Sequence, residues 1–324
     1  MTTKEKLLGL LEAHRGTYCS GEEIAGELAV SRAAVWKAVN ALRRDGYSID
    51  AVPNRGYALA AGTDILSAQG IRKYLESACD ALELHVLAET ASTNALVQQQ
   101  AAAGAAEGYA VIANAQTAGK GQYGRPFYSP DGTGAYLSIL LRPKRCPAQQ
   151  AIRITTMAAA AMCRAIEEVS GERPGIKWVN DIFVRGKKIC GILTEGSFSM
   201  ETGMLQYAVL GVGINVYEPE GGFPEELSGI AGSLFGAPRS DMKNRLVAAF
   251  LNHLMAFYRA ENPAAVLDAY RSYSLVVGRE VTVRAPSGDR KALVLGIDDD
   301  CHLDLRYDDG TEANLSCGEI SVRL

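Results

Sequence analysis

The apolar and polar positions of the N-terminal part have the spacing of short amphipathic helices. Three helices are predicted, over residues 3–15, 20–28 and 32–44. Leucines provide the apolar face of the first helix, and Ser20 with Glu23 forms the pattern of a capping box at the start of the second. Ser31 is a favourable N-cap for the third helix, which Gly46 ends.

The third helix separates a core stripe from a basic face. Val35, Val39 and Leu42 share one side, and residues 32–44 contain four cations and no acid. A short hairpin follows, with strands at 49–52 and 57–59 and a turn between them. This order is typical of a winged helix-turn-helix, in which the basic helix enters the major groove. The predicted DNA contacts are Arg32, Ala33, Trp36, Lys37, Asn40 and, at the wing tip, Arg55.

A three-helix interaction module with a solvated basic face is the alternative for this part of the chain. Trp36 beside Arg32 and Lys37 favours the DNA-binding interpretation, because an exposed tryptophan is hard to explain on a merely solvated face.

Beyond a small-residue linker at 60–64, longer apolar runs alternate with helical patterns. We expect helices at 66–77, 92–104, 152–169, 240–260 and 264–273, and strands at 82–87, 109–113, 135–141, 176–184, 188–194 and 207–215. In the first of these helices Gln69, Arg72 and Lys73 are expected to face water. The tail after Gly278 is strand-rich, with acidic turns. The expected domains are residues 1–62, 66–274 and 276–324.

Composition narrows the class of protein. The chain has 324 residues, 48% of them apolar, and a formal net charge of −4, which argues against a uniformly basic nucleic-acid protein. Residues 1–60 hold eight basic against seven acidic side chains, whereas residues 276–324 hold six against ten, so a polyanion should meet the N-terminal end. Neither a long apolar run nor a signal peptide is visible, which predicts a cytoplasmic protein. The seven scattered cysteines form no C-x-x-C pair and are expected to be free thiols.

Residues 119–125, Gly-Lys-Gly-Gln-Tyr-Gly-Arg, form a glycine-rich stretch with two cations. Such a loop can turn its N–H groups toward a phosphate or carboxylate. The spacing also matches G-x-G-x-x-G, but the dinucleotide fingerprint needs a helix next, which Pro126 and the turn at 129–132 prevent. Pro126 likewise argues against a kinase glycine loop. A surface loop that binds nothing is the remaining alternative.

Further motifs accompany this stretch along the chain. They are Ser92-Thr93-Asn94, Gln116-Thr117-Ala118, Lys177-Trp178-Val179-Asn180-Asp181, residues 188–193 (Lys-Ile-Cys-Gly-Ile-Leu) and residues 211–216 (Gly-Val-Gly-Ile-Asn-Val). Their order and spacing resemble the biotin protein ligase family over residues 66–324. With the predicted DNA-binding part, nearly the whole chain resembles the bifunctional form, which is also the biotin operon repressor.

The resemblance implies an α/β (α+β) architecture: a winged helix-turn-helix, a central mixed-sheet catalytic domain and a C-terminal SH3-like barrel. It implies that ATP and Mg²⁺ activate biotin to biotinyl-5'-AMP, which passes to a lysine of a biotin carboxyl carrier protein. It further implies that the adenylate is a corepressor that promotes a homodimer on operator DNA, and that the loop at 217–233 folds over adenosine.

The resemblance also assigns site residues. For biotin they are Ser92, Thr93, Asn94, Gln116, Lys120, Gly121, Gln122, Lys188 and Gly191; for ATP and the adenylate they are Gly119, Gly124, Arg125, Lys177, Asn180, Asp181 and Asn215. Lys188 would contact the biotin carboxylate and the α-phosphate. Arg125 and Lys177 would face the triphosphate, and Asp181 would serve Mg²⁺.

Two positions depart from the family pattern. Gln122 stands where the family often has a second arginine, and Val179 stands where it has proline. Glutamine cannot pair with phosphate by charge, so weaker retention of the adenylate is expected. Two rival functions remain: a ligand-sensing transcription factor with a silent ligase-like domain, and a lipoate or octanoate transfer enzyme. Intact Lys177, Asp181 and Lys188 argue against the first, and the DNA-binding part argues against the second.

Overall fold

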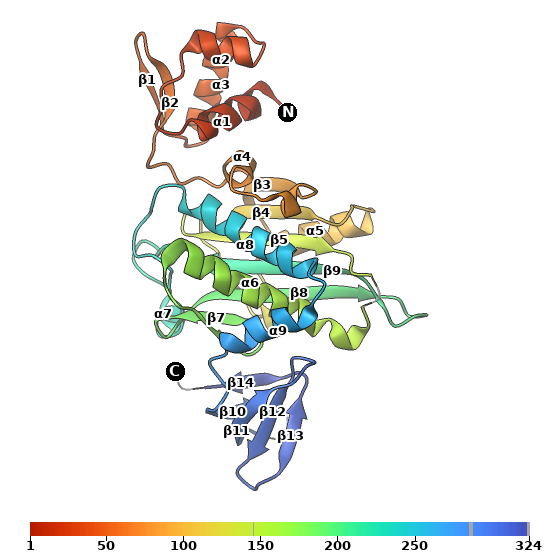
Figure 1. Ribbon diagram of the computed structural model, residues 1–324. Helices are drawn as coiled ribbons and strands as arrows, with labels where there is room; N and C mark the ends of the chain where they lie inside the picture. Colours follow the sequence, from red (N-terminus) through yellow and green to blue (C-terminus); the bar gives the residue numbers. More distant parts are fainter. Residues whose placement is uncertain (145, 285–287, 323–324) are drawn as a thin grey trace.

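The computed structural model describes residues 1–144, 146–284 and 288–322. Figure 1 shows three consecutive parts: a helical head, a central sheet covered by helices, and a small β domain at the opposite end from the head. The three sheets of these parts have two, seven and five strands. Within the described residues no helix is long and apolar enough to cross a membrane.

The head has the predicted helix-turn-helix and wing. Its elements are α1 (Thr3–Ala13), α2 (Gly21–Glu27), α3 (Arg32–Arg44), β1 (Ile49–Val52) and β2 (Gly56–Leu59). The capping box is confirmed, because the Ser20 hydroxyl accepts from the Glu23 N–H at 3.1 Å and the Glu23 carboxylate accepts from the Ser20 N–H at 2.9 Å. Ser31 caps α3, and Val35 and Val39 are buried as expected.

A glycine fixes the wing against the helices. Gly56 has a φ of +96°, and a Cβ there would lie 2.0 Å from the Cys19 carbonyl oxygen. Only glycine therefore allows β2 to approach the segment before α2. The approach leaves Arg55 exposed beside the Tyr18 ring, with its guanidinium carbon 4.2 Å from the ring centroid.

The central sheet has the strand order β3-β4-β5-β9-β8-β7-β6. The strands are β3 (Glu83–Thr90), β4 (Tyr109–Gln116), β5 (Gly134–Leu141), β6 (Gly175–Lys177), β7 (Asp181–Val184), β8 (Lys187–Phe198) and β9 (Leu205–Asn215). β3 runs parallel to β4, and the other neighbours are antiparallel. The sheet is therefore mixed, as predicted.

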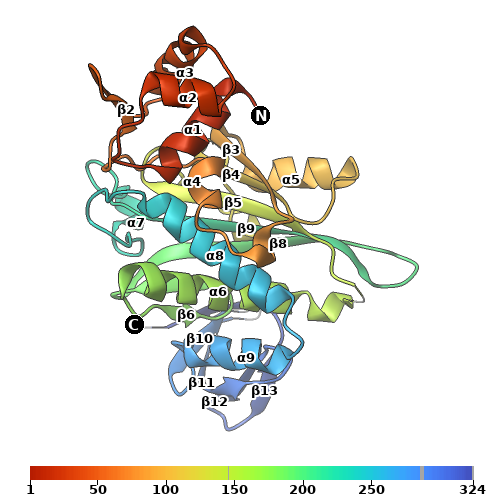
Figure 2. The same cartoon turned by 45° about the horizontal axis from the view of Figure 1, so that its top comes forward.

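Helices cover both faces of this sheet (Figures 1 and 2). The α-helices are α4 (Ala68–Arg72), α5 (Thr93–Ala102), α6 (Ile152–Ser170), α7 (Glu225–Ser228), α8 (Met242–Tyr258) and α9 (Pro263–Ser272); the 3-10 helices are η1 (Ser77–Cys79), η2 (Gln122–Gly124) and η3 (Ala148–Gln150). Val97 of α5 packs with Val111, Leu140 and Val209, whereas the intervening strand residues belong to the larger core with α6 and α8. This alternation is that of strands buried on both faces.

The predicted helix at 66–77 is wrong in extent, since α4 spans only Ala68–Arg72. Asn252 of α8 bonds to backbone groups that a longer α4 would use within the helix. Its side chain accepts from the Glu76 N–H and donates to the Tyr74 carbonyl, both at 2.9 Å. Arg72 is exposed, as expected, and Gln69 is half-buried. Lys73 does not face water but forms ion pairs with Glu12 and Asp241, described below.

The predicted single strand at 176–184 is also wrong. The segment is a hairpin of β6 and β7, with residues 178–180 as its turn and a cis peptide bond between Trp178 and Val179. Asn180 ties the turn to β8, where its Nδ2 donates to the Ile192 carbonyl at 2.7 Å. The hairpin places Lys177 and Asp181 opposite each other in register.

The C-terminal part is an antiparallel sheet of order β13-β12-β11-β10-β14. Its strands are β10 (Glu280–Arg284), β11 (Arg290–Ile297), β12 (Leu303–Tyr307), β13 (Glu312–Leu315) and β14 (Glu319–Ser321). This confirms the expected small β domain after a helical segment. The domain boundaries 1–62, 66–274 and 276–324 stay predictions.

Candidate functional site

A cavity of about 610 Å³ lies where the central and C-terminal parts meet. Its walls come from the start of α5, the glycine-rich stretch, the β6–β7 hairpin, strands β8 and β9, and strands β10 and β14 of the C-terminal part. Segments that are far apart in the sequence thus enclose one space. A volume of this size suits a small organic ligand.

Glycines in the strands make room for side chains that line the cavity. A Cβ at Gly211 would lie 2.0 Å from the Asn94 Oδ1 atom, and one at Gly213 would lie 2.5 Å from the Phe127 ring. Gly191 on β8 faces the same ring, at 3.1 Å. These close approaches give a physical reason for the Gly-Val-Gly motif of β9.

One end of the cavity is lined by uncharged hydrogen-bonding groups. The Thr93 N–H and hydroxyl both donate to Gln116 Oε1, at 2.9 and 3.1 Å, and Gln116 Nε2 donates to Ser129 Oγ at 3.1 Å. Ser92 is the N-cap of α5 and also borders the cavity. The capping and ligand-binding interpretations of Ser92 are therefore compatible. The arrangement holds fixed donors and acceptors toward a neutral polar group.

Two polar residues that the sequence analysis missed fix the Asn94 amide. Its Nδ2 donates to Glu195 Oε2 at 2.7 Å, and its Oδ1 accepts from the Ser138 hydroxyl at 2.5 Å. Ser138 is fully buried within β5. A hydroxyl in an otherwise apolar, buried strand needs a hydrogen-bond partner. Ser138 within the apolar run at 135–141 was therefore the signal in the sequence that could have indicated this contact.

The other end of the cavity carries charge. Lys188 Nζ lies 2.6 Å from Asp181 Oδ1, and both side chains are partly buried. Burial lowers the pKa of Lys177, with Asp181 opposing this effect and Lys188 adding to it. Because the Lys177 ammonium is incompletely compensated, an anionic ligand would be stabilised beside it.

The C-terminal part contributes charged residues that the sequence analysis did not assign to the site. Glu319 of β14 accepts two hydrogen bonds from Arg125, at 3.1 and 2.7 Å, and one from Arg284 at 3.4 Å. All three residues line the cavity. The hydrogen bond with Glu319 raises the pKa of Arg125, so this guanidinium is held charged at the cavity mouth. Trp178 also reaches the C-terminal part, because its Nε1 donates to the Cys301 carbonyl at 2.9 Å.

Most of the predicted ligand-binding residues lie around this single cavity. Those in its lining are Ser92, Thr93, Asn94, Gln116, Lys120, Gly121, Gln122, Arg125, Lys177, Asn180, Asp181, Lys188 and Gly191. Gly119, Gly124 and Asn215 lie outside the lining. Asn215 instead donates to the Gly232 carbonyl at 3.1 Å and so anchors the loop after β9. The ligand contacts of all these residues stay predictions.

A magnesium ion would have few protein ligands in this site. Over residues 1–144, 146–284 and 288–322, no group of three or more acidic, histidine or cysteine side chains could hold a metal. Asp181 provides one carboxylate in the cavity lining. This donor set fits Mg²⁺ that is held mainly by nucleotide phosphates and water, the usual mode for this ion.

Most of the predicted DNA-binding residues are exposed on the head. Arg32, Ala33, Trp36 and Lys37 are exposed on α3, and Asn40 is half-buried. The Trp36 side chain is 58% exposed, so it is not part of the core of the head. Arg43 takes a different role, since it donates to the Ile49 carbonyl and holds the wing.

Comparisons with known proteins agree with the three-part organisation. Residues 3–58 match an HTH domain, residues 86–215 the Biotin/lipoate A/B protein ligase family, and residues 276–323 the Biotin protein ligase C terminal domain. A biotin protein ligase from Aquifex aeolicus in complex with biotin and ATP superposes with a TM-score of 0.59 at 24% identity, covering 74% of this chain and 98% of that one. This likeness concerns the fold.

Two relatives are more similar in sequence. The bifunctional ligase/repressor BirA of Bacillus subtilis is 34% identical over 316 residues, which cover 95% of each chain. The protein of the same name from Escherichia coli is 33% identical over 66% of this chain and 64% of its own. With its helix-turn-helix head, mixed-sheet ligase domain and C-terminal β domain, the chain therefore belongs to the family of the bifunctional ligase/repressor BirA.

Proposed function

We propose that the chain is an ATP-dependent biotin protein ligase that also represses transcription in response to biotin. The observation that carries the enzyme is the cavity, which joins a neutral hydrogen-bonding end to a cationic end. The neutral end, around Thr93, Asn94 and Gln116, suits the ureido ring of biotin, whose N–H groups and carbonyl all need partners when buried. The cationic end suits a carboxylate that meets a triphosphate.

In the first step an oxygen of the biotin carboxylate attacks the α-phosphorus of ATP. A bond forms between them, the bond from that phosphorus to the pyrophosphate oxygen breaks, and pyrophosphate leaves with the electron pair. Lys188 and Lys177 hold the two anions together and stabilise the charge on the phosphate oxygens. Asp181 would help to hold Mg²⁺ bound with the triphosphate, and the ion would supply neutralisation of phosphate charge.

In the second step the amine of the acceptor lysine attacks the carbonyl carbon of biotinyl-5'-AMP. The new amide C–N bond replaces the C–O bond to phosphate, AMP leaves with the electron pair, and the nitrogen loses a proton to solvent. The acceptor is a lysine of a biotin carboxyl carrier protein. The acceptor would enter beside Arg125 and Glu319, where the glycine-rich stretch meets β14 and the Arg125 side chain is exposed.

The repressor function places α3 in the major groove of operator DNA, with Arg55 at the backbone or minor groove. Biotinyl-5'-AMP acts as corepressor, and its binding promotes a homodimer. The protein acts in the cytoplasm. Of the two alternatives, a silent sensor requires loss of the chemistry at Lys188, and a lipoate or octanoate transfer enzyme requires a different acid in the same cavity.

The test is pyrophosphate release in the presence of ATP and Mg²⁺, with biotin or lipoate as the acid. Release that depends on biotin supports the ligase. Binding of biotin without release would favour the sensor, and release with lipoate alone would favour the lipoate enzyme.

A further inference from the structure

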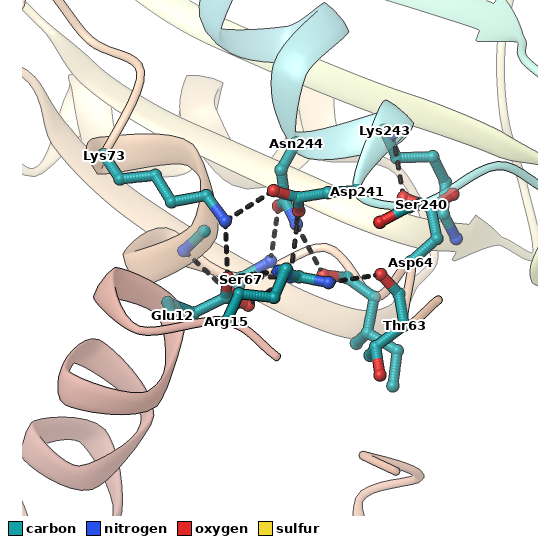
Figure 3. Close-up of polar contacts among 12 residues, drawn as sticks. Glu12, Arg15, Thr63, Asp64, Ser67, Lys73, Ser240, Asp241, Lys243 and Asn244 are labelled. Carbon is teal, nitrogen blue, oxygen red and sulfur yellow. Dashed lines mark hydrogen bonds and ion pairs between the residues drawn. The ribbon is translucent and has the colours of Figure 1, made fainter. Parts of the chain in front are cut away.

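The head meets the central part through charged side chains that are buried between them (Figure 3). Glu12 and Arg15 belong to the head, at α1 and just after it, whereas Lys73 and Asp241 flank α4 and α8 of the central part. We call Glu12, Arg15, Lys73 and Asp241 the four-charge cluster. It contains two anions and two cations, one of each from either side.

Each cation of the four-charge cluster contacts both anions. Lys73 Nζ lies 2.6 Å from Glu12 and 2.5 Å from Asp241, and Arg15 Nη2 lies 2.7 Å from Glu12 and 3.0 Å from Asp241. The Glu12 and Asp241 side chains are only 1% and 4% exposed. An orientation of the head that kept these side chains buried but separated the pairs would leave buried charges without partners, so the cluster favours the observed orientation.

The Asp241 side chain bonds to the head and does not cap α8. It precedes α8 without capping it, and its φ of +56° lies in the left-handed region. Its oxygens accept instead from Arg15, from Tyr74 Oη at 2.6 Å and from Asn244 Nδ2 at 2.8 Å. Residues with a Cβ keep such a conformation where surrounding contacts fix it, often at functional positions.

The linker joins the four-charge cluster to the loop after β9. Arg15 donates to the Thr63 carbonyl at 2.5 Å. The neighbouring Asp64 accepts from the Tyr217 hydroxyl at 2.5 Å and from the Lys243 N–H at 2.9 Å. Asp64 thus ties the linker both to the start of α8 and to the first part of the loop.

The same loop reaches the cavity at its other end. The Lys188 N–H donates to the Ile230 carbonyl at 2.8 Å, and the Gly232 N–H donates to the Lys188 carbonyl at 2.9 Å. Lys188, Ile230 and Gly229 line the cavity. The loop and the linker, together with these hydrogen bonds and ion pairs, therefore connect the cavity to the head.

We propose that the four-charge cluster positions the DNA-binding head and couples its orientation to occupation of the cavity through Asp64, Tyr217 and the loop at 217–232. This inference rests on the proposed repressor function. A ligand that orders the loop beside Lys188 also fixes Tyr217 and the linker, and the cluster transmits that order to α1. Coupling between two sites is reciprocal, so DNA increases the affinity for ligand by the same factor.

The test uses the full chain with Lys73→Gln, and with Arg306→Gln as control. Arg306 pairs with Glu312 on the surface of the C-terminal part, so both variants lose one positive charge. The DNA probe is a duplex that the unmodified protein selects from a random-sequence pool in the presence of biotin and ATP. Duplex affinity is measured with and without these ligands, and amide hydrogen exchange is followed in residues 3–15 and 61–75.

We expect Lys73→Gln to lower duplex affinity about tenfold in the presence of ligand, within the usual range of coupling between sites. The rate of pyrophosphate release should stay within about twofold of that of the control, which would show that the ligase domain is folded. Biotin and ATP should slow exchange in residues 61–75 of the control but not of Lys73→Gln. Lys73→Arg, which keeps the charge, should restore most of both effects.

Duplex affinity and ligand-dependent exchange equal to those of the control would overturn the inference. Tyr217→Phe supplies a second test, because it removes the hydroxyl that is bonded to Asp64 and to the Arg239 backbone and changes no member of the four-charge cluster. The response of residues 61–75 to ligand should weaken in this variant, and an undiminished response would contradict the coupling. If no duplex is selected, the repressor function fails, but hydrogen exchange still decides the coupling.

Discussion

Lys188 Nζ lies 2.6 Å from Asp181 Oδ1 on neighbouring antiparallel strands, at the charged end of the cavity. In the proposed reaction, the triphosphate meets the biotin carboxylate beside this pair. Asp181 holds the ammonium before ligand binds, and Lys177 lies opposite Asp181 in the β6–β7 hairpin. The site is therefore arranged in advance for two anions, which reduces the reorganisation needed in the reaction.

Lys188→Ala should reduce biotin-dependent pyrophosphate release by about ten- to a hundredfold, the usual effect of losing a hydrogen bond to a charged group. The reason is that the proposed contact of Lys188 with both anions is lost, while Lys177 remains. Single-turnover release at saturating ATP measures the loss. Lys291→Ala, an exposed lysine of β11, is the matched control. A rate near that of the unmodified protein would remove Lys188 from the reaction.

Gly211→Ala should raise the KM for biotin at least about tenfold and leave the KM for ATP nearly unchanged. The added methyl would lie 2.0 Å from Asn94 Oδ1, so the amide must leave its position between Ser138 and Glu195. A misplaced partner for a buried polar ligand costs about 1–3 kcal/mol. Gly236→Ala is the control, because nothing lies within 4 Å of its Cβ position. Equal increases in both KM values would indicate a general disturbance of the fold instead.

Gln122→Arg should slow the dissociation of biotinyl-5'-AMP. Gln122 lines the cavity, and an arginine there could form charged, two-pronged hydrogen bonds with the phosphate. A gain of about 1.4 kcal/mol corresponds to a tenfold slower off-rate. Displacement of labelled adenylate by excess unlabelled ligand measures both rates. Equal off-rates would refute the role given to this position.

Glu319→Gln should lower stability at neutral pH but not in acid. The hydrogen bonds from Arg125 hold the pKa of Glu319 below its usual 4.5, so the contact stabilises the fold above the unfolded-state pKa. This contribution is lost as the pH falls through the lower folded-state pKa. Because Arg125 is largely exposed, the free energy of unfolding of Glu319→Gln at pH 7 should be lower than that of the unmodified protein by less than about 1 kcal/mol. Urea unfolding of both proteins measures this difference in the free energy of unfolding at pH 7 and in acid. It should vanish in acid, and an equal difference at both pH values would exclude the Arg125–Glu319 contact as its cause.

Local sequence signals predicted most of the secondary structure, whereas the residues around the cavity were assigned by resemblance to a known family. Caps such as Ser20 and Ser31 act within one turn of the chain and are visible as short patterns. The failures came from tertiary contacts. Asn252 ends α4 from a distant helix, and Trp178 turns out of its strand to bond the Cys301 carbonyl.

The parts of the site that were missed have the same origin. Glu319 and Arg284 reach the cavity only because the C-terminal sheet packs at its mouth, and no spacing in the sequence records that contact. Lys73 was expected to face water on a predicted helix at 66–77. Its burial depends on Glu12 of the head and on Asp241 before α8, which lie far away in the chain.

The most direct test of the central claim is mass spectrometry of a biotin carboxyl carrier domain after incubation with this protein, biotin, ATP and Mg²⁺. We predict one biotinyl group on a single lysine of the carrier, with no labelling when ATP is omitted or when lipoate replaces biotin. An unlabelled carrier, from a sample that binds biotin, would contradict the account and leave the protein as a sensor.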